Sequence, residues 1–234
     1  MSGTKLQTRT HPLATRITHW LMVLAILILI GSGWRIYNAS PIFDFAFPDQ
    51  ITLGGDVEAA LALHNDPGVA SAIAWHFAAM WLLLLSYLGF MLWGVVSGHF
   101  RRDYLPVGPK SFWRDFSAAA RFKLAHNLGE YNAVQRVFYW GALAAIAMML
   151  LSGVTIWKPV QTYPLEVLFG GFQGARVVHF LFMSAIVLFL IVHVALVMLV
   201  PKTLVAMVLG KATATPHAHQ GGVQPANPYN GDPS

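Results

Sequence analysis

Two histidines in the last long apolar segment of the chain have the spacing with the most chemical meaning. His179 and His193 stand fourteen residues apart within residues 177–200, a segment without Asp, Glu, Lys or Arg. In an α-helix this spacing places both imidazoles within about 40° of one face and about 21 Å apart along the axis. Polar side chains at membrane depth usually face the interior of a bundle and have a function. The spacing therefore indicates two sites stacked at different depths.

The composition places the chain among membrane proteins. Of its 234 residues, 56% are hydrophobic and only 11% are charged, which is far too apolar for a soluble domain of this size. The chain has no cysteine. Disulfides, thiolate-bound metals, iron–sulfur clusters and the C-x-x-C-H attachment of c-type haem are therefore excluded. Any haem in this chain would be held non-covalently.

Four segments are long and apolar enough to cross a bilayer as helices, which requires about 20 mostly apolar residues. Tryptophans near the ends of the first three segments match the aromatic belts that form at membrane surfaces. We therefore expect an all-α integral membrane protein built as a four-helix bundle. The four segments are residues 17–37, 70–96, 137–156 and 177–200.

Charges outside the spans predict the orientation of the bundle. Lys and Arg are concentrated in the N-terminal tail, in the connection between the second and third spans, and in the C-terminal tail. The connection between the first and second spans is acidic instead. Because cytoplasmic loops carry the excess of Lys and Arg, both termini are expected in the cytoplasm. The formal net charge of +5 is then a topology signal, and we infer no nucleic-acid binding from it.

This orientation groups four membrane histidines into two pairs. His19 begins the first span at the depth of His193, near the cytoplasm, and His76 begins the second span at the depth of His179, near the outer face. Each pair could supply two axial imidazoles to one haem iron, one from each side of the ring. A lone membrane histidine could equally form an interhelical hydrogen bond. Four histidines that pair by depth favour two haem sites.

The spans contain no Asp or Glu. Ion pumps and cation transporters generally use such carboxylates to bind their cargo, so this composition counts against that class. Two alternatives stay open at this point. One is a membrane transporter that binds a metal ion or a small molecule through the histidines, and the other is a passive membrane anchor for a peripheral enzyme.

Other residues near the histidines could complete haem sites. Gly33 lies at the level of the outer pair and could leave room for a flat macrocycle, although small residues are common at membrane helix interfaces. Haem propionates are anionic and need cations at the membrane boundary. The same cations could simply anchor the helix ends by snorkelling. The candidates are Arg16 and Arg136 for the inner haem, and Arg35 and Arg176 for the outer haem.

Three short segments carry a resemblance to a known family. They are residues 16–20 (Arg-Ile-Thr-His-Trp), residues 131–136 (Tyr-Asn-Ala-Val-Gln-Arg), and residues 176–179 (Arg-Val-Val-His) with His193 fourteen residues on. With them the chain resembles the prokaryotic di-haem cytochrome b subunits that serve nickel–iron hydrogenases, formate dehydrogenases, thiosulfate reductases and related molybdenum enzymes. The resemblance covers about residues 11–205.

The resemblance implies an electron-transfer subunit of a larger complex rather than a stand-alone enzyme. One haem b would lie near each membrane face, the outer one held by His76 and His179 and the inner one by His19 and His193. Electrons would pass between a periplasmic redox enzyme subunit and an exchangeable quinone near the inner haem. Residues 1–205 would form the four-helix transmembrane di-haem cytochrome b domain, and residues 206–234 a flexible cytoplasmic tail.

Polar residues just before the third span are the candidates for quinone contacts. Tyr131, Asn132 and Gln135 are expected on the cytoplasmic side, where they could hydrogen-bond a quinone carbonyl beside the inner haem. Asn132 on its own could equally be a helix N-cap. Together with His193 they form the predicted quinone site.

Two connections are predicted to have roles of their own. The first outer connection, about residues 38–69, is long and acidic and contains Phe43, Phe45 and Phe47. Loops this long are usually functional or disordered, so we expect either a docking surface for the periplasmic partner or a lid over the outer haem. Residues 111–124 mix aromatic and basic side chains, which is typical of an amphipathic helix lying on the membrane surface. The partner, its substrate and any homo-oligomer are not specified by these patterns, because one fold serves many reactions.

Overall fold

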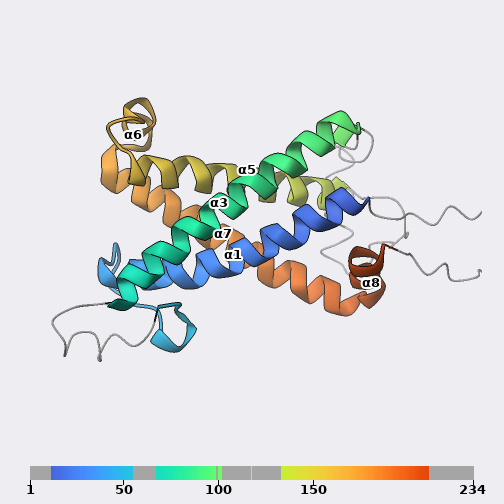
Figure 1. The fold of residues 1–234 in the computed structure, drawn as a ribbon, viewed down its shortest axis with the longest axis horizontal. Helices are drawn as coiled ribbons and strands as arrows, with labels where there is room; N and C mark the ends of the chain where they lie inside the picture. The colour runs from blue at the N-terminus through green and yellow to red at the C-terminus, as the bar shows by residue number, and fades with distance from the viewer. Residues whose placement is uncertain (1–11, 55–66, 99, 102–116, 118–132, 211–234) are drawn as a thin grey trace, which may run out of the picture.

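Four long helices dominate the computed structural model, which describes residues 12–54, 67–98, 100–101, 117 and 133–210 (Figure 1). All four are long and apolar enough to cross a membrane, and the described residues contain helices but no strands. The prediction of an all-α protein with four spans is therefore confirmed. The four are α1 (Leu13–Ala39), α3 (Pro67–Val96), α5 (Ala133–Trp157) and α7 (Gly171–Leu199).

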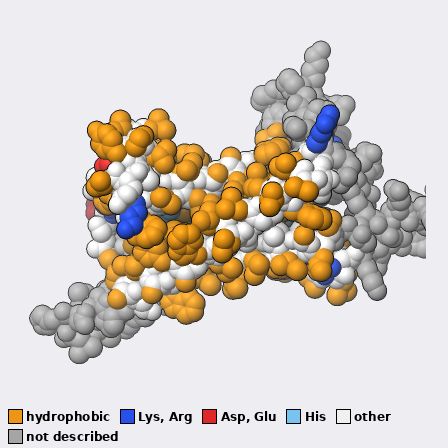
Figure 2. Space-filling model, turned by 45° about the horizontal axis from the view of Figure 1, so that its top comes forward, with side chains coloured by type: hydrophobic (Ala, Val, Ile, Leu, Met, Phe, Trp, Pro, Cys, Tyr) orange, Lys and Arg blue, Asp and Glu red, His pale blue; other side chains and the backbone are white. Residues whose placement is uncertain are grey.

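The surface of the bundle is what a bilayer requires. Large apolar side chains are exposed along all four long helices, among them Leu24, Leu85, Leu151 and Leu188. Figure 2 shows hydrophobic side chains over most of the visible face, with the Lys and Arg side chains toward the two ends. Lipid tails cover such a surface at little cost, whereas the charged ends stay near the headgroups.

Three shorter helices lie at the ends of the bundle. They are the 3-10 helix η1 (Asp49–Ile51), α6 (Tyr163–Phe169) and α8 (Pro201–Leu209). Pro201 starts α8, where a proline is favourable because the first amide of a helix has no partner to lose. The domain boundary predicted between residues 205 and 206 falls within α8. Residues 211–234 of the predicted tail lie outside the described residues.

The long helices pack as two pairs, α1 with α3 and α5 with α7 (Figure 1). Each pair is antiparallel, because its two helices are consecutive spans. Among the described helices, the backbones of helices from different pairs approach each other less closely than the two backbones within a pair do. Side chains rather than backbones therefore meet between the pairs, and they form a buried cluster that includes Met22, Leu83, Phe90, Ile146 and Ile186.

The start of α1 and the end of α8 meet at one end of the bundle. Arg16 donates hydrogen bonds to the carbonyl oxygens of Met207 (3.2 Å) and Val208, and Trp20 donates to Met207 as well (3.4 Å). Gly210 ends α8 in the left-handed conformation, with φ 73°. Carbonyls at a helix C-terminus lack hydrogen-bond donors within the helix, and Arg16 provides such donors. Its positive charge also interacts favourably with the negative end of the helix dipole.

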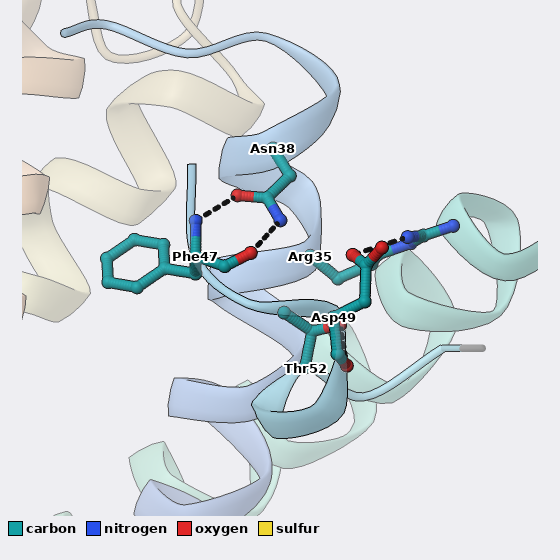
Figure 3. A network of polar contacts seen from close by, with 5 residues as sticks. All are labelled: Arg35, Asn38, Phe47, Asp49 and Thr52. Carbon is teal, nitrogen blue, oxygen red and sulfur yellow. Dashed lines mark hydrogen bonds and ion pairs between the residues drawn. The ribbon is translucent and has the colours of Figure 1, made fainter. Parts of the chain in front are cut away.

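At the opposite end, the first connection folds back onto α1 (Figure 3). The Asn38 side chain bridges both backbone groups of Phe47, at 2.8 and 2.9 Å. Arg35, which is 1% exposed, pairs with Asp49 at 3.4 Å. The Leu53 amide donates to the Gly31 carbonyl at 2.9 Å. Residues 40–54 are therefore held by polar contacts on the end of the bundle where α1 ends.

The predicted aromatic cluster belongs to this folded-back segment. Phe47 stacks on Trp34 of α1 at 4.7 Å, and Phe43 and Phe45 contact Phe180 of α7 at 5.2 and 6.1 Å. Phe180 is the neighbour of His179. The segment therefore packs beside the residue that follows His179, and both of its predicted roles, docking surface and lid, stay predictions. The amphipathic helix predicted at residues 111–124 lies outside the described residues except for Ser117.

Candidate functional site

The structure brings the four membrane histidines together in two pairs. The ring centres of His76 and His179 are 6.4 Å apart, and those of His19 and His193 are 6.3 Å apart. Each pair joins one helix of the first helix pair to α7 of the second. The two sites therefore lie between the helix pairs, about 21 Å apart along α7.

These separations fit a metal ion held between two imidazoles. A ring nitrogen binds zinc, and ions of similar size, at about 2.0–2.1 Å and lies about 1.1 Å from the centre of its own ring. Two imidazoles on opposite sides of one ion therefore have centres about 6.3 Å apart. Both histidine pairs have this separation within a few tenths of an ångström.

Two protein ligands per site fit haem better than a bare metal ion. Within residues 12–54, 67–98 and 133–210, no group of three or more His, Asp or Glu side chains could hold a metal ion. Structural zinc sites take four protein ligands, whereas haem supplies four nitrogens itself and needs only axial ligands. The residues present therefore fit haem iron with two axial histidines at each site.

Two buried serines hold the outer pair in matching ways. Ser32 Oγ lies 3.0 Å from Nδ1 of His76, and Ser152 Oγ lies 3.0 Å from Nδ1 of His179. Both serines are 0% exposed. Since the Nδ1 atoms face the serines, the Nε2 atom of each ring is the one available to a metal.

A glycine follows each of these serines and lies against the same ring. A Cβ atom placed on Gly33 would lie 3.4 Å from Cε1 of His76, and one on Gly153 would lie 3.2 Å from Cε1 of His179. Gly33 thus lies at the level of the outer pair and makes room for an imidazole. That it also leaves room for the macrocycle stays a prediction.

The inner pair has aromatic neighbours instead. His19 meets the edge of the Trp20 ring at 5.5 Å. His193 stacks on Phe189 at 5.5 Å with an interplanar angle of 15°. The stacked Phe189 ring therefore covers one face of the His193 imidazole.

Where the structure describes contacts of the four candidate arginines, these contacts are with other groups of the protein. Arg16 caps α8, and Arg35 pairs with Asp49. Arg176 donates to the Gln173 side chain at 2.9 Å and to the Ser40 carbonyl, which ties α7 to the end of α1. Arg136 is partly buried near the start of α5. Their roles toward haem stay predictions.

The predicted quinone residues are not described well enough to be placed. Tyr131 and Asn132 lie outside the described residues, and only the backbone of Gln135 is described, in the first turn of α5. The other six histidines of the chain also lie outside the described residues.

The sequence reading missed Ser32, Ser152 and Gly153, although an internal repeat marks them. Seven residues of α1 recur in α5 at one constant offset. In α1 they are Arg16, Trp20, Ala25, Ile26, Ser32, Gly33 and Ile36, and in α5 they are Arg136, Trp140, Ala145, Ile146, Ser152, Gly153 and Ile156. The serine–glycine step that touches each outer histidine is therefore repeated, and so are the histidines themselves, as His76-Phe77 and His179-Phe180.

The repeat does not extend to the inner pair. Phe90 of α3 occupies the position that corresponds to His193, and Tyr139 of α5 occupies the position that corresponds to His19. Phe90 packs on Phe100 at 5.7 Å, and Phe100 packs on Trp140 at 5.6 Å. The two halves of the chain thus contribute equivalent histidines to the outer pair only.

Comparisons with known proteins identify the family of the chain. The family model described as prokaryotic cytochrome b561 matches residues 10–210. A protein of Azospira oryzae named as the protein-methionine-sulfoxide reductase subunit YedZ1 is 45% identical over 86% of this chain and 96% of its own. A protein of Bradyrhizobium diazoefficiens named as a Ni/Fe-hydrogenase B-type cytochrome subunit is 26% identical over 76% of this chain and 73% of its own.

A third relative is the cytochrome b556(fdo) subunit of formate dehydrogenase from Escherichia coli, 24% identical over 85% of this chain and 82% of its own. The resemblance to hydrogenase and formate dehydrogenase cytochromes b is therefore confirmed. With four apolar spans and a family match over most of its length, the chain belongs to the prokaryotic cytochrome b561 family, as a multi-pass membrane b-type cytochrome that transfers electrons.

Proposed function

We propose that this chain carries electrons across a bacterial inner membrane through two haems b, from a quinol near the inner pair to an oxidoreductase bound at the outer end. The separation of the histidine rings, 6.3 and 6.4 Å, is the observation that carries the proposal. This separation would let the two imidazoles of each pair hold one iron between them. His76 and His179 would hold the outer haem, and His19 and His193 the inner one.

Bound haem would supply a carrier for one electron at a time. The protein sets the distance between the two sites and provides the side chains that lie between them. Between the two depths a small cavity is lined by apolar residues such as Ile26, Leu83, Met149 and Ile186. Leu83 and Ile186 each lie seven residues after an outer histidine, halfway to the inner depth. This apolar layer keeps water and protons out of the path of the electrons.

Protons and electrons separate at the inner end. A quinol that becomes a quinone releases two electrons and two protons, and only the electrons can enter the apolar layer. Tyr131, Asn132 and Gln135 are proposed to hydrogen-bond the quinone, and Arg16 and Arg136 to lie near the propionates of the inner haem. Arg35 and Arg176 are proposed to do so at the outer haem, in addition to the protein contacts described above.

The partner is proposed to be a reductase for methionine sulfoxide in proteins. The relative that is 45% identical is named as a subunit of such an enzyme, and it matches this chain far more closely than the hydrogenase and formate dehydrogenase relatives do. Reduction of a sulfoxide consumes two electrons and two protons and yields a thioether and water. The two electrons of one quinol therefore balance the reduction of one methionine sulfoxide.

Haem counting with ligand variants tests the electron path. The purified chain is expected to bind two haems, with a reduced-minus-oxidised spectrum of b type. His76→Ala and His193→Ala should each retain one haem, lose the other, and abolish electron transfer from a quinol analogue to the partner. Phe90→Leu is the matched control, because Phe90 occupies the position corresponding to His193, and it should keep both haems.

Other results would point to the alternative functions. A chain that binds no haem but binds a metal ion through the same histidines would be a transporter or metal carrier. Histidine variants that leave haem content and quinol oxidation unchanged would indicate a passive anchor. Each of these results would overturn the proposal.

The partner is tested separately, in membranes that contain the chain and its co-purifying subunit. Haems reduced with a quinol analogue should be reoxidised by a protein containing methionine sulfoxide. Rapid haem reduction by hydrogen or formate, without reoxidation by the sulfoxide, would reject this partner while leaving the di-haem path intact.

A further inference from the structure

The serine contacts at the outer pair are the most regular feature of the site. Besides its contact with His76, Ser32 Oγ lies 2.7 Å from the Ile28 carbonyl of its own helix. Ser152 Oγ likewise lies 2.7 Å from the Met148 carbonyl. Both hydroxyls thus stand between a backbone carbonyl four residues earlier and an imidazole nitrogen on the neighbouring helix.

This arrangement assigns donors and acceptors. A carbonyl oxygen can only accept, so each serine hydroxyl donates its single proton to it. The remaining lone pairs of the oxygen then accept a hydrogen bond, and the Nδ1–H group of the imidazole is the donor in reach. The Met149 carbonyl also lies 3.3 Å from Ser152 Oγ, so a second carbonyl acceptor is in reach of the serine proton.

We infer that Ser32 and Ser152 are positioning residues that hold His76 and His179 as Nδ1–H tautomers and thereby tune the outer haem. The inference rests on the proposed function for the presence of that haem. An imidazole that donates from Nδ1 has a more basic Nε2, since the acceptor draws the proton away from the ring. A more basic ligand favours ferric over ferrous iron, so the two serines should lower the reduction potential of the outer haem.

The two contacts should contribute equally, because they have the same length and the same burial. Loss of a hydrogen-bond partner behind a metal-bound histidine typically costs about 10–100-fold in metal affinity. If the oxidised form loses about tenfold more affinity than the reduced form, the potential rises by about 59 mV. We expect a rise of about this size in Ser32→Ala/Ser152→Ala and about half of it in each single variant.

Ser86 is a matched control in the same membrane. It is 5% exposed and hydrogen-bonds the Leu82 carbonyl of its own helix α3 at 2.7 Å. Its other hydrogen bond in the described part of the chain goes to the neighbouring carbonyl of Leu83. Ser86→Ala thus removes the same group from the same kind of helix without touching an imidazole donor.

The test is a potentiometric titration of both haems, combined with electron paramagnetic resonance of the oxidised protein. The outer haem is identified as the signal that His76→Ala removes. The serine variants should raise its potential and change its low-spin signal, while the inner haem and the Ser86→Ala protein stay unchanged. Ser152→Thr keeps a hydroxyl and should restore the original potential.

Each result of this test bears on the inference or on the proposed function. Unchanged outer-haem potentials in the double variant would overturn it, as would equal shifts in Ser86→Ala. Loss of the outer haem alone, with retention in Ser152→Thr, would support it as a requirement for ligation. If the unmodified chain bound no haem, the proposed function would fail first, and the two failures would be told apart by the haem count.

Discussion

Replacing glycines in α5 and α1 tests how tightly the His179 and His76 rings are packed. Gly153 and Gly141 lie on the same helix, but a Cβ atom on Gly153 would lie 3.2 Å from Cε1 of His179, whereas one on Gly141 would meet nothing within 4 Å. Gly33 is intermediate, with its added Cβ 3.4 Å from Cε1 of His76. The three substitutions to alanine therefore form a graded series.

The magnitudes follow from two opposing effects. Alanine in place of glycine stabilises a helix by up to about 1 kcal/mol, which Gly141→Ala should gain in full. Carbon atoms prefer separations of about 3.5–4.0 Å, so the His179 ring would have to retreat by a few tenths of an ångström in Gly153→Ala. Overpacking of this kind typically costs about 1–3 kcal/mol. Gly153→Ala should thus be less stable than Gly141→Ala by about 1–3 kcal/mol, with Gly33→Ala between them.

The assay is loss of haem on heating, followed by the absorbance of bound haem in detergent. The midpoint should fall in the order Gly141→Ala, Gly33→Ala, Gly153→Ala, and the low-spin signal of the outer haem should change only in the last two. If Gly153→Ala behaved like Gly141→Ala in both measurements, the close contact between helix α5 and the His179 ring would be refuted.

Two further predictions concern the ends of the bundle. Asp49→Ala leaves the buried Arg35 with one fewer partner and should destabilise the folded first connection by about 1–3 kcal/mol, so proteolysis of this connection should become faster. Asp44 is an exposed carboxylate of the same connection, and the Asp44→Ala protein should be cleaved at the original rate. Gly210→Ala places a Cβ on a residue with left-handed φ, 73°, next to the Arg16 guanidinium, so amide exchange near the end of α8 should become faster. Gly98→Ala is the control, because φ is also left-handed there, 66°, but the space around the added Cβ is open. Amide exchange near Gly98 should therefore rise less.

The four spans were predictable because each contains enough apolar residues to cross a bilayer, a signal that needs no tertiary information. Pairing His19 with His193 by depth used only span order and charge, and the structure places these rings beside each other. Helix α8 was not predicted as an element. Pro201 follows the last apolar span and looks like its end, yet a proline in the first turn begins a new helix equally well.

The serine contacts could not be predicted from residue type. A serine in a membrane helix commonly bonds its own backbone, as Ser86 does, and nothing in its local sequence distinguishes it from Ser32. Only the recurrence of serine–glycine in α5 separates the two cases. The return of the first connection to α1 depends on contacts such as that of Phe47, in the connection, with Trp34 of α1. The connection has no periodic pattern from which such contacts could be predicted.

Helix α7 supplies one histidine to each of the two pairs, and this has a consequence for biosynthesis. Because His179 and His193 each supply one half of a different pair, neither site has two histidines until the last span has left the ribosome. About 100 residues separate the end of α3 from the end of α7, which at about 5–20 residues per second takes roughly 5–20 s. Throughout that interval α7 and its two histidines are absent from the membrane. Under the proposed function a truncated chain could therefore not hold haem between two histidines, and haem content would report complete synthesis.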